Sequence, residues 1–332
     1  MRISILDQSP IAENENATDA LRKTVQFAQF ADENGFHRFW VSEHHNFAEL
    51  AGSAPEALIP YLLAKTERIR VGSGGVMLQH YPAFKVAEVF NVLASLEPGR
   101  VDLGIGKAPG GTTLSTKALQ GHTTQQQDFD EKLEELLHFV GEGETVEGLI
   151  ARPTPPLPAD VYLLGGSVKS AELAATKGIS YVFASFINSN REELLEAASA
   201  YRRLFTHRTK KPELLVAMGI IVSETDDEAK QLNKYPYSYK VHVDDGRALN
   251  MNSYERAVAF GESTGMNYWI DKKESGVIAG SIQTVEQELE KRLAGLEIDE
   301  LIIHTPITDF DKRINMLKQL KNLPVFQTES IV

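Results

Sequence analysis

Residues 69–106 read IRVGSGGVMLQHYPAFKVAEVFNVLASLEPGRVDLGIG. The segment begins and ends with a strand-like run, 69–78 and 100–106, in which apolar residues and glycine predominate, as is typical of strands buried on both faces. The longer stretch between the two runs belongs to the helical patterns that alternate with strands along the chain. A strand, a helix and another strand in this order indicate an α/β protein with a parallel sheet.

Six further segments have the composition of buried strands. They are residues 2–7, 37–42, 160–165, 179–185, 213–222 and 299–305. Eight strands that alternate with helices predict a (β/α)8 barrel of the TIM type. A doubly wound open sheet is the competing arrangement, because it has the same alternation.

Several helix boundaries are signalled by capping residues. Asn34-Gly35 is a C-cap pattern that ends the first helix, and Gly141 follows an amphipathic segment at 126–140. Thr284 and Gln287 form the pattern of a capping box, which predicts a helix from there to about Leu293. A further helix is expected at 310–321.

The length of 332 residues exceeds a minimal barrel of about 250 residues. We interpret residues 1–332 as one barrel domain and place the surplus at 232–282, between the seventh and eighth strands. This insertion is polar, rich in tyrosine and asparagine, and weakly periodic, and a lid is one role for it. Residues 151–159, with four prolines, are expected to form an extended surface loop.

Composition excludes several classes of function. The net charge of −12 argues against a surface for nucleic acid or for an anionic membrane. The chain has no cysteine, which removes disulfides, iron–sulfur clusters, thiolate nucleophiles and cysteine-based zinc sites. Since no signal peptide and no apolar run of membrane-spanning length are seen, we expect a soluble, cytoplasmic protein.

The sequence Ser42-Glu43-His44-His45 closes the second strand. Alternation along a strand places Glu43 and His45 on one side and His44 on the other. A single inward-facing imidazole is suited to proton transfer near neutral pH. The structural alternative is one hydrogen-bonded histidine under a loop and one exposed histidine.

A metal site is the other use for these histidines. His44, His80 and His304 all lie near the expected carboxyl ends of strands, where Asp7 could join them. No spacing typical of a metal-binding motif connects them, so no metal is expected.

Glycine-rich turns at three strand ends are candidates for ligand binding. Gly74 and Gly75 interrupt the third strand, which indicates either close approach of a flat ligand or tight packing of the strand. Lys107 follows the fourth strand and is either a phosphate ligand or a surface lysine. Residues 165–170 (GGSVKS) offer an anion site at a helix N-terminus, although a simple N-cap also accounts for the serine.

Taken in order, these segments resemble the bacterial luciferase-like flavin monooxygenase family, in its single-chain subgroup. The similarity is dense over residues 1–110, moderate over 160–186 and nearly absent over 187–298. The segments that carry it are 5–10 (ILDQSP), 42–46 (SEHHN), 69–110, 162–185 (YLLGGSVKSAELAATKGISYVFAS) and 300–307 (ELIIHTPI).

The resemblance implies a barrel that holds reduced FMN at its C-terminal mouth, and a homodimer. His44 matches the histidine that acts beside the flavin and substrate, and Gly74-Gly75 matches the strand position, often with a cis peptide, against which the isoalloxazine packs. The phosphate positions correspond to Lys107, Gly165, Gly166, Ser167 and Ser170, and the substrate side to His45, Gln79 and His80.

Three positions depart from the family pattern. Relatives often have arginine at the position of Lys107, alanine at Ser42, and Pro-Asn-His where this chain has Gln79-His80-Tyr81. Lysine cannot bind a phosphate in the bidentate manner of arginine. The last difference bears on substrate preference.

The implied activity is that of a two-component monooxygenase. A separate flavin reductase supplies reduced FMN, and the enzyme uses it with O2 to oxidise a small organic substrate, of which an aldehyde is one example. Two alternatives stay open at this point. One is a deazaflavin-dependent oxidoreductase without oxygen chemistry, and the other is a noncatalytic flavin-binding protein.

Overall fold

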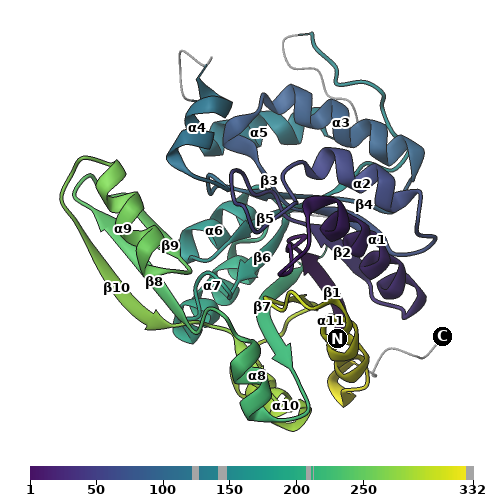
Figure 1. Ribbon diagram of the computed structural model, residues 1–332. Helices are drawn as coiled ribbons and strands as arrows, with labels where there is room; N and C mark the ends of the chain where they lie inside the picture. The colour runs from purple at the N-terminus through teal and green to yellow at the C-terminus, as the bar shows by residue number, and fades with distance from the viewer. Residues whose placement is uncertain (122–126, 141–147, 207–210, 212, 327–332) are drawn as a thin grey trace.

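The computed structural model describes residues 1–121, 127–140, 148–206, 211 and 213–326. Within them, parallel strands pair in the order β7-β12-β1-β2-β3-β4-β5-β6, and β6 pairs with β7 to close the ring into a barrel (Figure 1). This closure excludes the doubly wound sheet. The barrel strands are β1 (Arg2–Asp7), β2 (Arg38–Val41), β3 (Arg70–Met77), β4 (Val101–Gly106), β5 (Asp160–Gly165), β6 (Ser180–Ala184), β7 (Leu214–Val222) and β12 (Glu300–His304).

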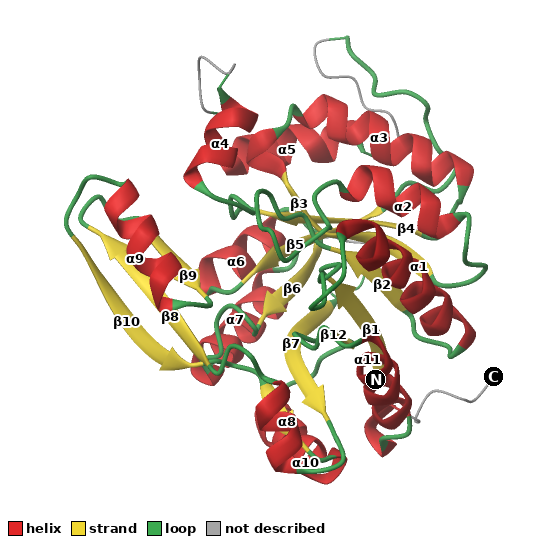
Figure 2. Cartoon of the chain, viewed as in Figure 1, coloured by secondary structure: helices red, strands yellow, loops and turns green. Residues whose placement is uncertain are grey.

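Helices surround the strands, as Figure 2 shows. They are α1 (Ala17–Glu33), α2 (Pro55–Leu63), α3 (Ala83–Leu96), α4 (Thr113–Gln120), α5 (Phe129–Phe139), α6 (Val168–Thr176), α7 (Arg191–Leu204), α8 (Asp226–Leu232), α10 (Ile282–Leu293) and α11 (Phe310–Lys321). Short 3₁₀ helices follow β3 at Leu78–His80 and α11 at Pro324–Phe326. None of the described helices combines the length and the apolar character that crossing a membrane requires.

All eight expected strands are confirmed. The first helix ends as expected, with Asn34 as its C-cap and Gly35 at a φ of 75°, and α11 spans the expected residues. The predicted start of α10, a capping box that opens at Thr284, was wrong. The N-cap of α10 is Ser281, whose hydroxyl accepts a hydrogen bond from the backbone N–H of Thr284. Gly141 lies outside the described residues.

The insertion at 232–282 contains structure that the sequence did not indicate. Strands β8 (Tyr237–Val243), β9 (Ala248–Met251) and β10 (Tyr268–Glu274) form an antiparallel sheet, beside which helix α9 (Tyr254–Ser263) lies (Figure 1). Only one face of this sheet is covered, with Val241 and Val243 buried. The short strand β11 (Ile278–Gly280) then pairs with the end of β7.

Alternation along the strands separates two cores. Residues such as Ile5, Phe39 and Ile303 face outward and pack under the helices. The inward-facing residues form a smaller cluster within the barrel. Its members are Leu6, Trp40, Tyr162, Val182, Leu215, Ala217 and Ile302. The same alternation decides which side chains face the C-terminal mouth.

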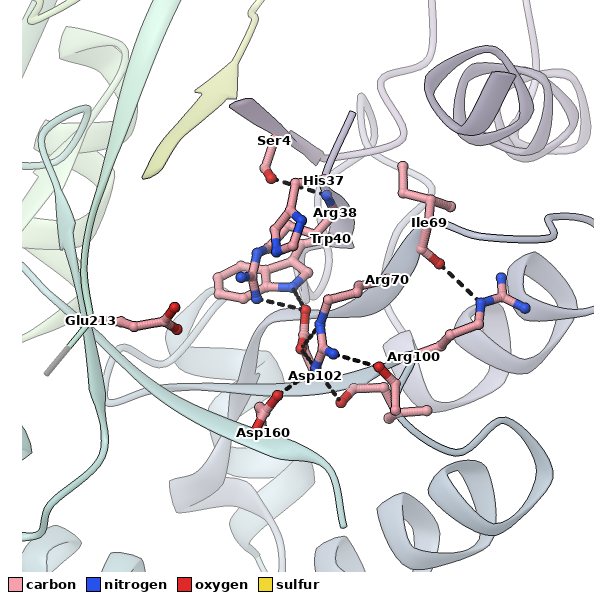
Figure 3. Close-up of polar contacts among 12 residues, drawn as sticks. Ser4, His37, Arg38, Trp40, Ile69, Arg70, Arg100, Asp102, Asp160 and Glu213 are labelled. Atoms are coloured by element: carbon pink, nitrogen blue, oxygen red, sulfur yellow. Dashed lines mark hydrogen bonds and ion pairs between the residues drawn. The ribbon is translucent and has the colours of Figure 1, made fainter. Parts of the chain in front are cut away.

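A buried ionic network fills the opposite end of the barrel, where the strands begin (Figure 3). The Arg38 guanidinium donates two hydrogen bonds to Glu300, at 2.6 and 2.9 Å, and one to Asp102 at 2.8 Å. Asp102 also accepts from Trp40 Nε1 at 2.9 Å and pairs with Arg70. Burial alone would raise the pKa of Asp102, but the positive charges of Arg38 and Arg70 lower it by more. The pKa of Asp102 therefore lies below its usual value.

Candidate active site

His44 stands at the C-terminal mouth of the barrel, just after β2. Its Nδ1 lies 2.9 Å from the Ser42 hydroxyl, and its ring centre lies 6.0 Å from that of Phe47. Burial lowers the pKa of His44 to about 4, an effect that His45 reinforces and Glu49 opposes. The imidazole is therefore neutral at pH 7 and can accept a proton.

Glu43 and His45 lie beyond the end of β2, where their side chains bond to each other. His45 Nε2 lies 2.8 Å from the Glu43 carboxylate, which also accepts from the backbone N–H of Met77 at 3.1 Å and from the Tyr81 hydroxyl at 2.7 Å. No sequence pattern predicted Tyr81 at this position. These bonds tie the end of β2 to the end of β3 and hold the backbone that carries His44.

Gln79 and His80 line a cavity of about 540 Å³ between the 3₁₀ helix at 78–80 and helices α4 and α5. His80 Nε2 lies 2.7 Å from the Pro109 carbonyl, and its Nδ1 lies 3.0 Å from Gln120 Nε2. The Gln79 carbonyl accepts from Lys132 Nζ at 3.3 Å, and burial lowers the pKa of Lys132. Contact of His45, Gln79 or His80 with a substrate stays a prediction.

The glycines of β3 are required by packing. The Gly74-Gly75 peptide bond is cis. A Cβ on Gly75 would lie 2.7 Å from the Gly104 carbonyl oxygen, and one on Gly104 would lie 2.1 Å from the Ser73 carbonyl oxygen. Since backbone cannot yield at these distances, no side chain fits between β3 and β4. Tight strand packing therefore accounts for these glycines, and contact of a flat ligand with them stays a prediction.

The turn from β5 to α6 has the geometry of a capped helix N-terminus, and binding of an anion there stays a prediction. Ser167 caps α6 and its Oγ accepts from the Ser170 backbone N–H, while Ser170 Oγ lies 2.9 Å from the Tyr181 hydroxyl. Gly106 and Leu164 are paired in register, so Lys107 lies beside Gly165 and Gly166. Its ammonium group is 5.2 Å from the centre of the Phe129 ring. All the cofactor candidates thus gather at one edge of the mouth.

His304 is a residue of the mouth to which the sequence assigned only a metal role. It ends β12, is 9% exposed, and its ring centre lies 5.4 Å from that of Phe186. Asp7 points outward instead, where it accepts from Thr24 Oγ1 at 2.7 Å and pairs with Arg313. In the part of the chain that the structure describes, no group of three or more potential ligands is placed to hold a metal ion.

The two imidazoles of the mouth predict a pH dependence of stability. Burial lowers the pKa of His44 and of His304 to about 4 from 6.5. Because the folded state then binds fewer protons than the unfolded chain, the stabilisation is complete above pH 6.5 and is lost as the pH falls toward 4. Each imidazole should contribute about 1–3 kcal/mol to this loss, after allowance for partial exposure.

Urea unfolding of the wild type and of His44→Gln between pH 7.5 and 4 measures this effect. We expect the free energy of unfolding of the variant to fall less steeply over that range. Parallel curves for the two proteins would show that His44 titrates normally in the folded state.

Comparison with known proteins identifies the family. The family model described as luciferase-like monooxygenase matches residues 1–296. The chain belongs to the luciferase-like monooxygenase family. It is 47% identical over 312 residues to the N-acetyl-S-alkylcysteine monooxygenase of Bacillus subtilis (strain 168), which covers 92% of this chain and 93% of the relative.

Two solved structures support the same fold. Apo-MsnO8 has a TM-score of 0.78 and 31% identity and covers 96% of this chain and 97% of its own. The oxygenating constituent of the 3,6-diketocamphane monooxygenase from Pseudomonas putida, solved in complex with FMN, has a TM-score of 0.69 and 17% identity, with 97% of each chain covered. The resemblance seen in the sequence and the barrel are therefore confirmed, and the chain is a monooxygenase of this family.

Proposed function

We propose that the chain is the oxygenating component of a two-component monooxygenase that uses reduced FMN and O2 on an N-acetyl-S-alkylcysteine. One oxygen atom enters the substrate, the other leaves as water, and reduced flavin supplies the two electrons. The substrate is taken from the name of the relative that is 47% identical along nearly the whole of both chains. The observation that supports the proposal is the partly buried imidazole of His44, bonded to Ser42 at the C-terminal mouth of the barrel, with its pKa lowered to about 4.

The residues present fit FMN. The N-terminus of α6, with Ser167 and Ser170, and the adjacent Lys107 offer donors and positive charge for the phosphate. The backbone of β3 at Gly74 and Gly75 offers a flat wall for the isoalloxazine. Bound flavin supplies the reaction with oxygen, whereas the protein orients it and excludes water. His44 would hold or accept a proton at its imidazole, oriented by the Ser42 hydroxyl.

The assay of this proposal combines the purified protein, FMN, a generic flavin reductase with NADH, isotopically labelled O2 and N-acetyl-S-ethylcysteine. We expect a product that carries one labelled oxygen atom and a turnover number of roughly 0.1–10 s⁻¹, within or below the usual enzyme range. A long-chain aldehyde in place of the thioether tests the other substrate expectation.

The alternatives differ in their outcomes. Oxidation of the aldehyde but not of the thioether would transfer the assignment to aldehydes. Tight deazaflavin binding with hydride transfer and no labelled product would favour the deazaflavin oxidoreductase. Flavin binding with no product from any probe would leave a noncatalytic flavin-binding protein.

We propose that the insertion is a lid over the mouth, and two contacts support this. Arg256 of α9 pairs with Glu49 in the loop after β2 and lies 5.2 Å from the Phe47 ring centre. Asn250 of β9 donates to the Ile187 carbonyl, after β6, at 3.0 Å. β2 and β6 are four strands apart and so lie opposite each other in the ring. The insertion therefore spans the opening.

A lid of this kind limits the waste of reduced flavin. Arg256→Met removes an exposed ion pair and a cation–π contact, together about 1 kcal/mol, so the ratio of hydrogen peroxide released to product formed should rise about three- to tenfold. Lys240→Met, on an exposed position of β8, is the matched control and should leave the ratio unchanged. An unchanged ratio in Arg256→Met would contradict the role of this contact.

The partners follow from the same proposal. A separate reductase delivers reduced FMN, and the protein functions in the cytoplasm as a homodimer. The exposed apolar side chains Tyr61, Val92 and Leu96, on the adjacent helices α2 and α3, support a protein–protein interface.

A further inference from the structure

We infer that His304 is a substrate-binding residue, whose Nδ1 accepts a hydrogen bond from the amide N–H of the N-acylated amino acid. The inference rests on the proposed substrate class and adds a residue that determines specificity. It also gives a use to a side chain that the family resemblance left without a role.

The register of two strands places His304 and His44 at the same opening. Along β12, Glu300 bonds to Arg38 on the barrel axis and Ile302 joins the inner cluster, so His304 faces inward two residues later. Along β2, Arg38 and Trp40 face inward in the same way, and the strand ends at Val41, three residues before His44. Only β1 separates the two strands. The charge of His44 lowers the pKa of His304, which agrees with their proximity.

The imidazole of His304 has an unused hydrogen-bonding atom. Its Nδ1 is buried and has no partner among the described residues. We assign the ring proton of the neutral imidazole to Nε2, on the side of the Leu6 backbone, whose contact raises the pKa of His304, so that Nδ1 is the acceptor. An unpaired buried acceptor carries a free-energy cost, and such groups in native proteins usually serve a ligand or a water molecule.

His44 does not satisfy this acceptor, because its own Nδ1 is engaged by Ser42. Asp7 and Arg313 do not satisfy it either, since they pair with each other on the outer side of β1. The mouth thus holds two neutral imidazoles with different tasks, one assigned to the proton of the reaction and one open to a ligand.

The chemistry of the acceptor selects the group that it binds. An imidazole lone pair requires an N–H or O–H donor. At neutral pH an N-acetyl-S-alkylcysteine has one such donor, its amide N–H, because the carboxylate and the thioether sulfur only accept. Phe186, beside His304, adds an apolar surface for the alkyl group. His304 therefore distinguishes an acylated amine from a simple thioether of the same size.

The test is a cycle that changes the protein and the ligand separately. Isothermal titration of the FMN-loaded, oxidised protein compares N-acetyl-S-ethylcysteine with its analogue methylated on the amide nitrogen, which lacks the donor. For the wild type, methylation should weaken binding about three- to tenfold, the value of one neutral hydrogen bond. For His304→Ala, binding of the parent compound should weaken by a similar factor, and methylation should then have no further effect.

His304→Gln retains an acceptor and should recover part of the affinity for the parent compound only. The dissociation constant of FMN should stay within about twofold of the wild-type value in both variants, which separates a substrate contact from a cofactor contact. The methylated ligand tests the wild type directly, so the experiment stands even if His304→Ala does not fold.

Each other outcome is decisive. Equal loss on methylation in wild type and His304→Ala would overturn the hydrogen bond while leaving the proposed function intact. Weaker FMN binding with unchanged substrate binding would make His304 a cofactor residue. Wild-type protein that neither binds nor oxidises N-acetyl-S-ethylcysteine would refute the substrate class, and this inference with it.

Discussion

Replacing His44 with alanine should lower the rate of substrate oxygenation by about 10²–10⁴-fold, the usual contribution of a general acid or base. The imidazole is neutral at pH 7 because burial lowers its pKa to about 4, and no other side chain is held by Ser42 at this position. Binding of FMN should change less than about threefold, since the phosphate and ring candidates lie on β3, β4 and the β5–α6 turn. Product formation and flavin titration measure the two effects separately.

His138→Gln is the matched control, because His138 is exposed on α5, away from the mouth. It should retain full oxygenation. We further expect the reduced flavin consumed by His44→Ala to appear as hydrogen peroxide, so that oxygen uptake continues without product. Normal product turnover in His44→Ala would remove His44 from the reaction.

Arg38→Met should destabilise the protein by about 3–5 kcal/mol, the cost of breaking a buried ion pair from one side. Arg38 is 1% exposed, and both Asp102 and Glu300 would lose their main cation. Both carboxylates are fully buried, and neither can turn to solvent. Urea unfolding at pH 7 measures the change, and the loss should shrink as the pH falls and Asp102, which Arg38 holds at a lowered pKa in the wild type, is protonated.

Lys177→Met provides the comparison at the surface. Lys177 pairs with Glu134 at 2.9 Å, but the Glu134 side chain is 58% exposed, so its loss should cost about 0–1 kcal/mol. If the two variants were equally stable, the network at the base of the barrel would be as weak as an ordinary surface pair.

The barrel was predictable because each of its strands is a compact apolar run. Apolar patterning reports burial, and strands such as β7 and β12 are buried along their full length. The insertion was not predictable in the same way. Only one face of its sheet is covered, and residues such as Lys240, Lys272 and Lys273 on its strands read as loop. The start of α10 was missed because Ser281 and Thr284 each fit an N-cap pattern.

The residues of the candidate site also differ in how far the sequence predicted them. Alternation within one strand was enough to separate His44 from Glu43 and His45. The place of His304 in the site could be predicted only by knowing that β12 pairs with β1, and the two strands are almost 300 residues apart in sequence. The contact of Tyr81 with Glu43 likewise depends on the pairing of β2 with β3. Alternation does show that Asp7 and Leu6 face opposite sides of β1, so the grouping of Asp7 with His304 as metal ligands could have been rejected earlier.

The ion pairs of Arg38 affect the route by which reactants enter and leave the barrel. Arg38, Asp102, Glu300 and Trp40 pack across the base and close the described barrel at that end. On the proposed function, we expect the cofactor and the organic substrate to enter, and the product to leave, through the mouth at the other end. We therefore expect a compulsory order: a substrate bound first blocks the larger cofactor, and spent cofactor departs only after the product has gone.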